Sequence, residues 1–355
     1  MSQRSKTASC TTALATTLAL IDQFAASLLP TGPHHHDIPP SSPDAPSPLL
    51  LLAAAARSLK AQVTKLSLLT VTTPFTPSAI ATTLQAVNDS VLPSLVTATL
   101  LVSADAFTAS FAKECRAYVQ ATLRDLKALV VLVESRSSNA NHGKTTPPDT
   151  VTEDRKNRLT ETTGRVWQDC DVVVAFADGG IPAFVVSKAK QWLELMKDAV
   201  AELQQWDPEE VVDEADLFAN VNANDRATIS AGVKDQALKV LSRIPQSVHV
   251  VVKQRLETLR QQQLSSDVRP RLDPILIHLS SISELIDESA EAMYLGNLEL
   301  CLKKAGEARA VTIELVENAL DGFIHDQKGK ENESQEDKYV KRALDWIRQV
   351  ETAKG

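Results

Sequence analysis

The chain has little glycine and few aromatic residues, and both shortages restrict its fold. Of its 355 residues 11 are glycine, with Gly32 the only one before Gly143, and aromatic residues make up 4%. A β protein with many tight turns needs glycine at positions with positive φ, so the scarcity argues against that class. Hydrophobic residues still reach 43%. A sizeable core is therefore available, built mostly from Leu, Val, Ile and Ala.

Paired cysteines and basic stripes are also missing. The four cysteines lie far apart without a C-x-x-C pair, which argues against a zinc site and a disulfide framework (Cys10, Cys115, Cys170 and Cys301). The net charge is −8 and no stretch forms a basic stripe, which argues against direct nucleic-acid binding. The apolar run Leu49–Ala56 is too short to span a membrane. We therefore expect neither nucleic acid nor a membrane as a partner.

The N-terminus has two readings. Arg4 and Lys6 precede an apolar run, and no acid occurs before Asp22, a pattern that loosely resembles a targeting peptide. The apolar residues, however, share one helical face: Leu14, Leu18, Ile21, Phe24 and Leu28. That spacing favours a first bundle helix over a targeting peptide.

Helical periodicity continues through most of the chain. Apolar residues recur at intervals of three or four, most clearly from Phe111 to Val133, and with heptad spacing from Val185 to Leu203. The pattern predicts an all-α fold with about eleven helices in two antiparallel bundles. The expected helices are 5–29, 49–71, 77–103 with a kink at Pro93, 105–136, 151–177, 182–206, 222–243, 246–264, 271–294, 297–325 and 337–353.

Three polar stretches separate the expected helices. A Pro/His-rich loop covers 30–48, and a second loop covers 137–150. The segment 207–217 contains six acids and no base, which is typical of a solvated linker. We therefore expect an N-terminal helical bundle at 1–206 and a C-terminal helical bundle at 218–355, joined by this acidic linker.

The stretch 160–206 carries three of the four tryptophans. Its apolar run Val172–Phe176 precedes Gly179 and Gly180, and a strand feeding a glycine turn would suggest a nucleotide site. The motif G-x-G-x-x-G is missing, however, and no partner strand is evident. We therefore expect two helices broken at this point, with Gly179 as the left-handed C-cap. The tryptophans Trp167, Trp192 and Trp206 are then expected to be core anchors.

Two loop motifs resemble ligand sites. Gly143-Lys144-Thr145 suggests a phosphate-binding loop, but the glycine required five positions earlier is Ser138. The run His34–His36 suggests a transition-metal site, yet side chains diverge along an extended segment and do not close around a metal. Both motifs are interpreted as ordinary loop sequence.

Cysteines and paired acids are the candidate catalytic groups. Cys115, Cys170 and Cys301 fall on apolar helix faces, where cysteine is usually a small core residue. Asp169, Asp171 and Asp178 surround one helix and are interpreted as a solvated flank. We therefore expect no catalytic, cofactor-binding or metal-binding residues, no cofactor and no enzyme activity.

Four stretches, taken in order, resemble a known family. They are Leu59–Leu69 before a Thr/Pro break, the hairpin 80–133, Val166-Trp167-Gln168-Asp169-Cys170 followed by Pro182 and the exit Asp207-Pro208, and Ile286–Ser289 with Met293-Tyr294. Together they resemble the cyclin-D-binding protein 1 family, also called Grap and cyclin-D interacting protein. The Pro/His-rich insert and the C-terminal tail depart from the family pattern.

The resemblance implies antiparallel bundles similar to those of talin and vinculin, and a non-enzymatic role. Family members are described as binding D-type cyclins and helix-loop-helix transcription factors, and as damping cell-cycle progression and transcription. A similar role in the cytoplasm and nucleus is therefore expected here. The alternative is a cytoskeletal scaffold of the vinculin or talin type, which shares the fold, so the fold alone does not separate the two.

Overall fold

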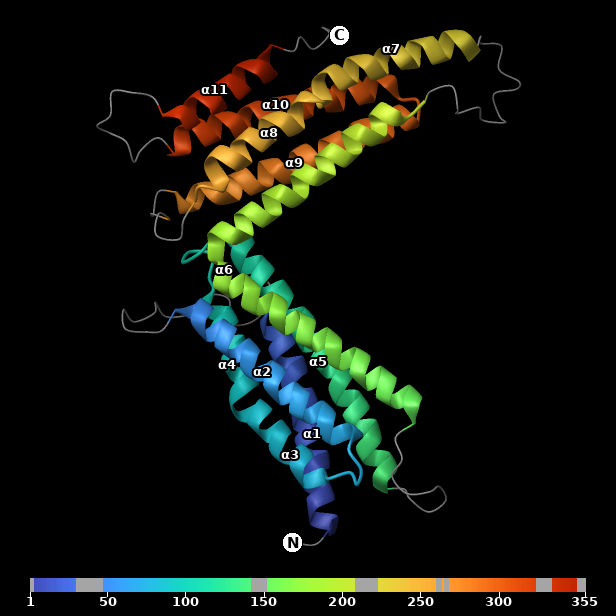
Figure 1. Ribbon diagram of the computed structural model, residues 1–355, viewed down its shortest axis with the longest axis vertical. Coiled ribbons are helices and arrows are strands. Elements are labelled where there is room, and N and C mark those ends of the chain that lie inside the picture. Colours follow the sequence, from blue (N-terminus) through green and yellow to red (C-terminus); the bar gives the residue numbers. More distant parts are fainter. Residues whose placement is uncertain are drawn as a thin grey trace. The chain divides into compact units, whose positions relative to one another are not determined.

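The computed structural model describes residues 3–29, 47–141, 152–207, 223–259, 264, 268–323 and 334–349. Within these residues every regular element is helical and no strand occurs, which confirms the predicted all-α class (Figure 1). The chain divides into two compact units, residues 1–180 and 181–355. The likeness of these units to talin and vinculin bundles stays a prediction.

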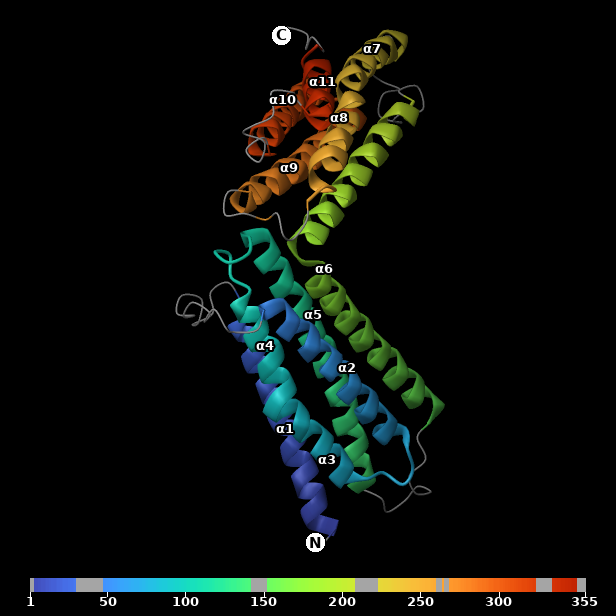
Figure 2. The ribbon, with the colours of Figure 1, turned by 60° about the vertical axis from the view of Figure 1, so that its left-hand side comes forward.

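Unit 1 is built from long helices around an aliphatic core. Its elements are α1 (Gln3–Ser27), α2 (Pro48–Val71), α3 (Pro77–Ala86), α4 (Leu92–Leu101), α5 (Ala109–Asn141) and the part of α6 (Glu153–Gln205) that ends at Gly180. Helix α1 contacts α3 and α5, while α2 contacts α3 and α4 (Figures 1 and 2). Leu14, Leu59 and Leu95 are completely or almost completely buried. The N-terminal segment is thus a bundle helix in this structure.

An aromatic cluster joins α5 to α6. Phe111 is fully buried, and its ring stacks on Phe107 at 5.5 Å and on Phe176 at 4.3 Å between ring centroids. Tyr118 meets Phe176 edge to face at 5.3 Å. Since aromatic residues are rare in this chain, four of them in one place make a local centre of the unit 1 core.

Pro93 is accommodated by a π-helical turn. We expected a kink at this proline, because it has no N–H to donate to the carbonyl four residues earlier. The structure has a π turn at Val87–Val91, just before this proline, in which the Leu92 N–H bonds to the Val87 carbonyl. One widened turn thus joins α3 to α4 around the missing donor.

Helix α6 breaks at Gly180, where the two units divide. Gly180 has φ 62° and ψ −163°, a conformation that is essentially restricted to glycine. The expected left-handed residue was Gly179, so the prediction was wrong by one position. The expected domain boundary at 207–217 also differs from the observed division, because the part of α6 after Ile181 packs with the C-terminal helices. Most of the acidic linker lies outside the described residues.

Unit 2 contains the remaining helices. They are the rest of α6, α7 (Ala223–Leu241), α8 (Arg243–Val251) with a π turn at Val252–Leu256, α9 (Arg269–Tyr294), α10 (Leu298–Phe323) and α11 (Gln335–Arg348). Helices α9 and α10 pack together as a hairpin, and Gly296 closes it with φ 71°. Ser289 Oγ donates to the Cys301 carbonyl at 2.9 Å across this hairpin.

Helix α11 is fastened to α8 and α10 at its apolar face and at its C-terminal end. Val340, Ala343, Leu344 and Ile347 are its buried residues. The carbonyls of its last turn accept hydrogen bonds from two arginines, Arg243 to Trp346 at 2.8 Å and Arg309 to Ile347 at 3.0 Å. Positive charge at a helix C-terminus is favourable, so both arginines stabilise the docked helix.

One loop prediction was wrong in part. Helix α5 continues to Asn141, so residues 137–141 of the expected loop 137–150 are helical. Ser137 is buried, and its Oγ lies 3.9 Å from Cys10 Sγ on α1, so packing against α1 extends α5 past the point where the apolar pattern ends. The rest of that loop, and all but the last two residues of the Pro/His-rich loop 30–48, lie outside the described residues.

Candidate functional site

The cysteines are chemically quiet core residues, as predicted for Cys115, Cys170 and Cys301. All four are buried. Burial raises the pKa of Cys115 to about 12. The pKa of Cys170 is also raised to about 12, first by burial and then by the charges of Asp169 and Asp171. Since the thiolate is the reactive form, these thiols are poor nucleophiles at neutral pH.

The two loop motifs, Gly143–Thr145 and His34–His36, lie outside the described residues. Within the described part of the chain, no group of three or more His, Cys, Asp or Glu residues is arranged to hold a metal ion. The remaining candidates in that part of the chain are surfaces that a protein partner can contact.

Ion pairs cross from α2 to α6 in unit 1. Arg57 Nη2 lies 2.6 Å from Asp178 Oδ2, and Lys60 Nζ lies 2.6 Å from Asp171 Oδ1. Both acids are exposed, so the prediction of a solvated flank holds for them. Exposed pairs contribute little stability, and their main effect here is to fix the register of two antiparallel helices.

Trp167 lies on this same side of α6. It is 37% exposed and is one helical turn from both Thr163 and Asp171, each of which contacts α2. Thr163 Oγ1 donates to Ser67 Oγ at 3.0 Å, and the next residue, Leu68, is 61% exposed. We call this surface the Trp167 face; its residues are Trp167, Asp171 and Asp178 of α6 with Arg57, Lys60 and Leu68 of α2.

The exposure of Trp167 corrects the prediction that it is a core anchor. Trp167, Asp171 and Asp178 are spaced four and seven residues apart, so they share one side of α6. That spacing placed the ring on the charged flank rather than on the buried face of Val166 and Cys170. The spacing of Trp167 from Asp171 and Asp178 could therefore have predicted its exposure.

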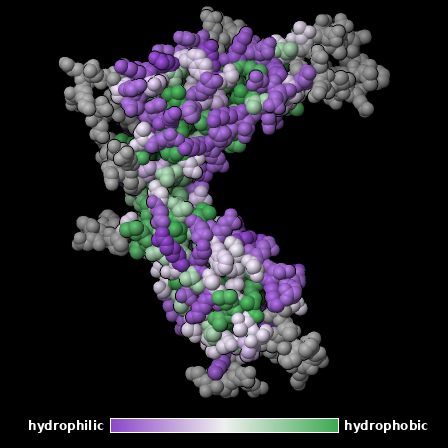
Figure 3. Space-filling model, in the orientation of Figure 1, coloured by the Kyte–Doolittle hydropathy of each residue, from purple (hydrophilic) through white to green (hydrophobic). Residues whose placement is uncertain are grey.

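Trp167 is the aromatic member of a small set. The exposed large hydrophobic residues in the described part of unit 1 are Leu29, Leu50, Leu51, Leu68, Val131, Trp167 and Val172. The face seen in Figure 3 shows apolar residues in separate groups among polar ones. Tryptophan is enriched among residues that dominate binding energy at protein interfaces, so Trp167 marks the first candidate surface.

Asp169 departs from the prediction of a solvated flank. It points towards α5, and its Oδ2 is buried without a hydrogen-bond partner. The pKa of Asp169 is raised to about 6, first by burial and then by the charge of Asp125 and a hydrogen bond with it, while the charges of Arg124 and Arg165 oppose the shift. Two carboxyl groups thus face each other between α5 and α6.

Asp169→Asn tests this arrangement. An unfolded aspartate has a pKa of about 4, so the folded chain binds the proton more tightly. The carboxyl's contribution to stability therefore falls as pH rises from about 4 to about 6. We expect the variant to have a higher free energy of unfolding at pH 8, by up to about 1 kcal/mol after solvent screening, and little change at pH 4. Urea unfolding at both pH values measures this.

Asp171→Asn is the matched control for that experiment. Asp171 is exposed and paired with Lys60, so its loss is expected to lower stability slightly at pH 8. If Asp169→Asn instead lowered the free energy of unfolding at pH 8, as Asp171→Asn does, the Asp169 carboxylate would be favourably paired and the prediction would be wrong.

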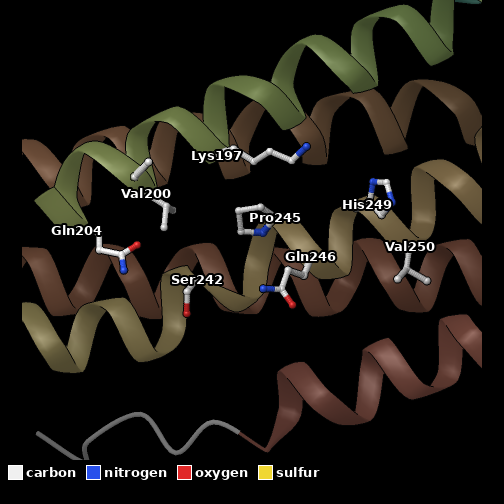
Figure 4. Close-up of a pocket in the computed structure, with 9 residues that line it drawn as sticks. Lys197, Val200, Gln204, Ser242, Pro245, Gln246, His249 and Val250 are labelled. Carbon is white, nitrogen blue, oxygen red and sulfur yellow. The ribbon is translucent and has the colours of Figure 1, made fainter.

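Unit 2 contains a groove of about 660 Å³ between α6 and α8, lined by Lys197, Val200, Ala201, Gln204, Ser242, Pro245, Gln246, His249 and Val250. Figure 4 shows its polar side chains spread along the groove rather than converging. Lys197 Nζ is also engaged by Glu194 at 2.7 Å. Binding sites for small molecules have convergent polar groups, so this groove does not support catalysis.

Helix α6 is long and apolar enough to cross a membrane by length and composition alone. Its most apolar stretch has a mean hydropathy of 1.6, and 39% of that stretch is buried. The helix breaks at Gly180, and Asp171 and Asp178 pair with cations on α2. These features favour packing against protein over contact with lipid.

A comparison with known families matches the part of the chain that contains the Trp167 face. Residues 51–209 match the family model described as Grap2 and cyclin-D-interacting, N-terminal. A comparison with curated proteins gave no match. The matched range includes the whole Trp167 face, and it confirms the resemblance noted from the sequence.

Proposed function

Residues 51–209 belong to the Grap2 and cyclin-D-interacting family, and from this premise we propose that the chain is a non-enzymatic protein that binds a D-type cyclin. The family match is the observation that carries the proposal. The Trp167 face lies inside the matched range and supplies the surface. Its half-exposed ring is the anchor, and the ion pairs around it form a charged rim.

This surface suits a partner that has an apolar pocket with charges beside it. Burying the Trp167 ring removes a large apolar area from water, which supplies most of the binding energy. Arg57 and Lys60 present positive charge, and Asp171 and Asp178 present negative charge, along the same line. Charges of both signs around an anchor select the partner and fix its orientation more than they add affinity.

Trp167→Ala is expected to weaken binding of a purified D-type cyclin by about thirtyfold, that is by about 2 kcal/mol. Isothermal titration calorimetry measures this. The matched control is Val172→Ala, because Val172 is 38% exposed on the same helix but about 140° around it. Equal loss in both variants would contradict a specific role for the Trp167 face.

We also propose that this binding damps cell-cycle progression and transcription, that helix-loop-helix proteins are further partners, and that the chain acts in the cytoplasm and nucleus. Affinity purification of the tagged chain, with cyclins, helix-loop-helix proteins and actin-associated proteins scored separately, tests the partners. Recovery of cytoskeletal proteins alone would support the scaffold alternative. Cell fractionation tests the location.

A further inference from the structure

A second surface lies in unit 2, where α6 runs beside α9 (Figure 1). The rings of Trp206 and Tyr294 meet with centroids 5.5 Å apart, and Glu202 acts on the titration of both Asp287 and Tyr294. Later residues of α6 therefore meet later residues of α9, and the two helices run parallel. We call this surface the α6–α9 face; its residues are Leu195, Asp198, Glu202 and Trp206 of α6 with Glu284, Asp287, Glu291, Tyr294 and Leu295 of α9.

Both ends of the α6–α9 face carry apolar side chains that are open to solvent. Leu195 is 47% exposed at one end. Tyr294 is 37% exposed and Leu295 is 76% exposed at the other end, beside Trp206. Leu195 and Trp206 are eleven residues apart on one helix, about 16 Å. An uncovered apolar pair at this separation suits the two ends of a short partner helix.

The middle of the face is acidic. Asp198, Glu202, Glu284, Asp287 and Glu291 form no ion pair with any described residue. Burial raises the pKa of Asp287, and the charges of Glu202 and Glu284 raise it further, so these carboxylates repel one another. Lys234, the lysine nearest Trp206, donates instead to the main-chain carbonyls of Gln204, at 3.0 Å, and Trp206.

We propose that the α6–α9 face binds a basic amphipathic helix of another protein, whose apolar side chains cover Leu195 and the Trp206–Tyr294 pair while its lysines and arginines pair with the carboxylates between them. The positive charges relieve the repulsion among the acids, and the apolar ends set the length and register of the helix. This inference goes beyond the proposed cyclin binding, which uses a different surface in unit 1.

The test uses the full chain and a synthetic peptide of about 20 residues, with leucines at helical spacing and lysines on the same face. Its binding is measured by fluorescence anisotropy at two salt concentrations. Glu202→Gln with Asp287→Asn is expected to weaken binding at least tenfold and to reduce its salt dependence. These near-isosteric changes remove repulsion, so the fold is expected to persist, and circular dichroism checks this.

General attraction to an acidic protein is the main competing explanation. Residues 181–355 contain 30 Asp and Glu against 22 Lys and Arg, so a basic peptide is attracted anywhere on this half of the chain. Asp235→Asn with Asp345→Asn is the matched control, because it removes the same charge from exposed positions on α7 and α11. Equal weakening by both pairs, or full binding after the Glu202 and Asp287 changes, overturns the proposal.

The apolar ends of the face need a separate variant. Leu195→Ser with Leu295→Ser is expected to weaken the leucine–lysine peptide at least tenfold, with its salt dependence retained, because the carboxylates remain. A peptide with the leucines replaced by alanine is expected to bind weakly to the unchanged chain. Equal binding of both peptides would show attraction by charge alone and would contradict a helix-binding face. Cyclin binding through Trp167 is unaffected in these variants if the two surfaces are separate.

Discussion

Phe111→Ala is expected to lower the free energy of unfolding of unit 1 by about 4 kcal/mol. The removed ring is fully buried and stacks on both Phe107 and Phe176. Its loss leaves a cavity between α5 and α6 in addition to the lost transfer energy. Chemical denaturation followed by circular dichroism measures the change, and hydrogen exchange locates it in α5 and the first part of α6.

Phe111→Leu is a smaller change at the same site. Leucine keeps much of the volume but loses the stacked contact, so the expected loss is about 1 to 2 kcal/mol. If both variants were equally stable to denaturant, the aromatic cluster would not be the centre of the unit 1 core. Exchange in α9 and α10 is the internal reference, since these helices belong to the other unit.

Arg255→Met is expected to lower the free energy of unfolding of unit 2 by about 3 kcal/mol. Arg255 is 5% exposed, donates from Nε to the Ala319 carbonyl at 3.1 Å and pairs through Nη2 with Asp337. Without the guanidinium, the carbonyl and the carboxylate both lose a partner in a poorly solvated place. Hydrogen exchange of α11 is expected to rise before that of α9.

The Arg255–Asp337 pair also predicts that the stability of unit 2 depends on pH. Burial alone raises the pKa of Asp337, but hydrogen bonds from Ser334 and Arg255 and the charge of Arg255 hold it below its usual value. A lowered folded-state pKa gives stability that is present above about pH 4 and is lost as pH falls through the folded-state value. A double-mutant cycle of Arg255→Met and Asp337→Asn at pH 7 is expected to show a coupling of about 2 kcal/mol. Additive losses would contradict a direct interaction.

The sequence predicted the helices well because their apolar spacing is regular. The ends of the two clearest apolar patterns are all buried, namely Phe111, Val133, Val185 and Leu203. Cys115 and Cys170 were expected on apolar helix faces and are likewise buried. These predictions need only the periodicity of one helix.

The positions of single side chains near the edge of a buried face were harder to predict. Trp167 lies next to buried Val166, and hydrophobicity alone placed it in the core, although its spacing from Asp171 placed it on the flank. Asp169 was expected in solvent because it is an acid on an apparently polar side. Its contact with Asp125, 44 residues earlier, depends on how α5 and α6 pack, and no local pattern encodes that contact.

Contacts between distant segments were also outside the reach of local patterns. Arg255 and Asp337 are 82 residues apart, and neither lies in a motif. The division of the chain at Gly180 depends on which helices the second part of α6 packs against. The acidic stretch 207–217 indicated a domain boundary more strongly than Gly180 did, because linkers between domains are usually polar. A polar stretch shows only that its residues are exposed, and it does not show where a core ends.

The most direct test of the proposed function is hydroxyl-radical footprinting of the full chain with and without a purified D-type cyclin. Trp167 is half exposed in the free chain, so its side chain is expected to be oxidised readily. In the complex its oxidation is expected to fall several-fold, while that of Tyr339 in unit 2, 42% exposed, stays unchanged. A complex that forms while Trp167 is oxidised as fast as in the free chain would contradict binding through the Trp167 face.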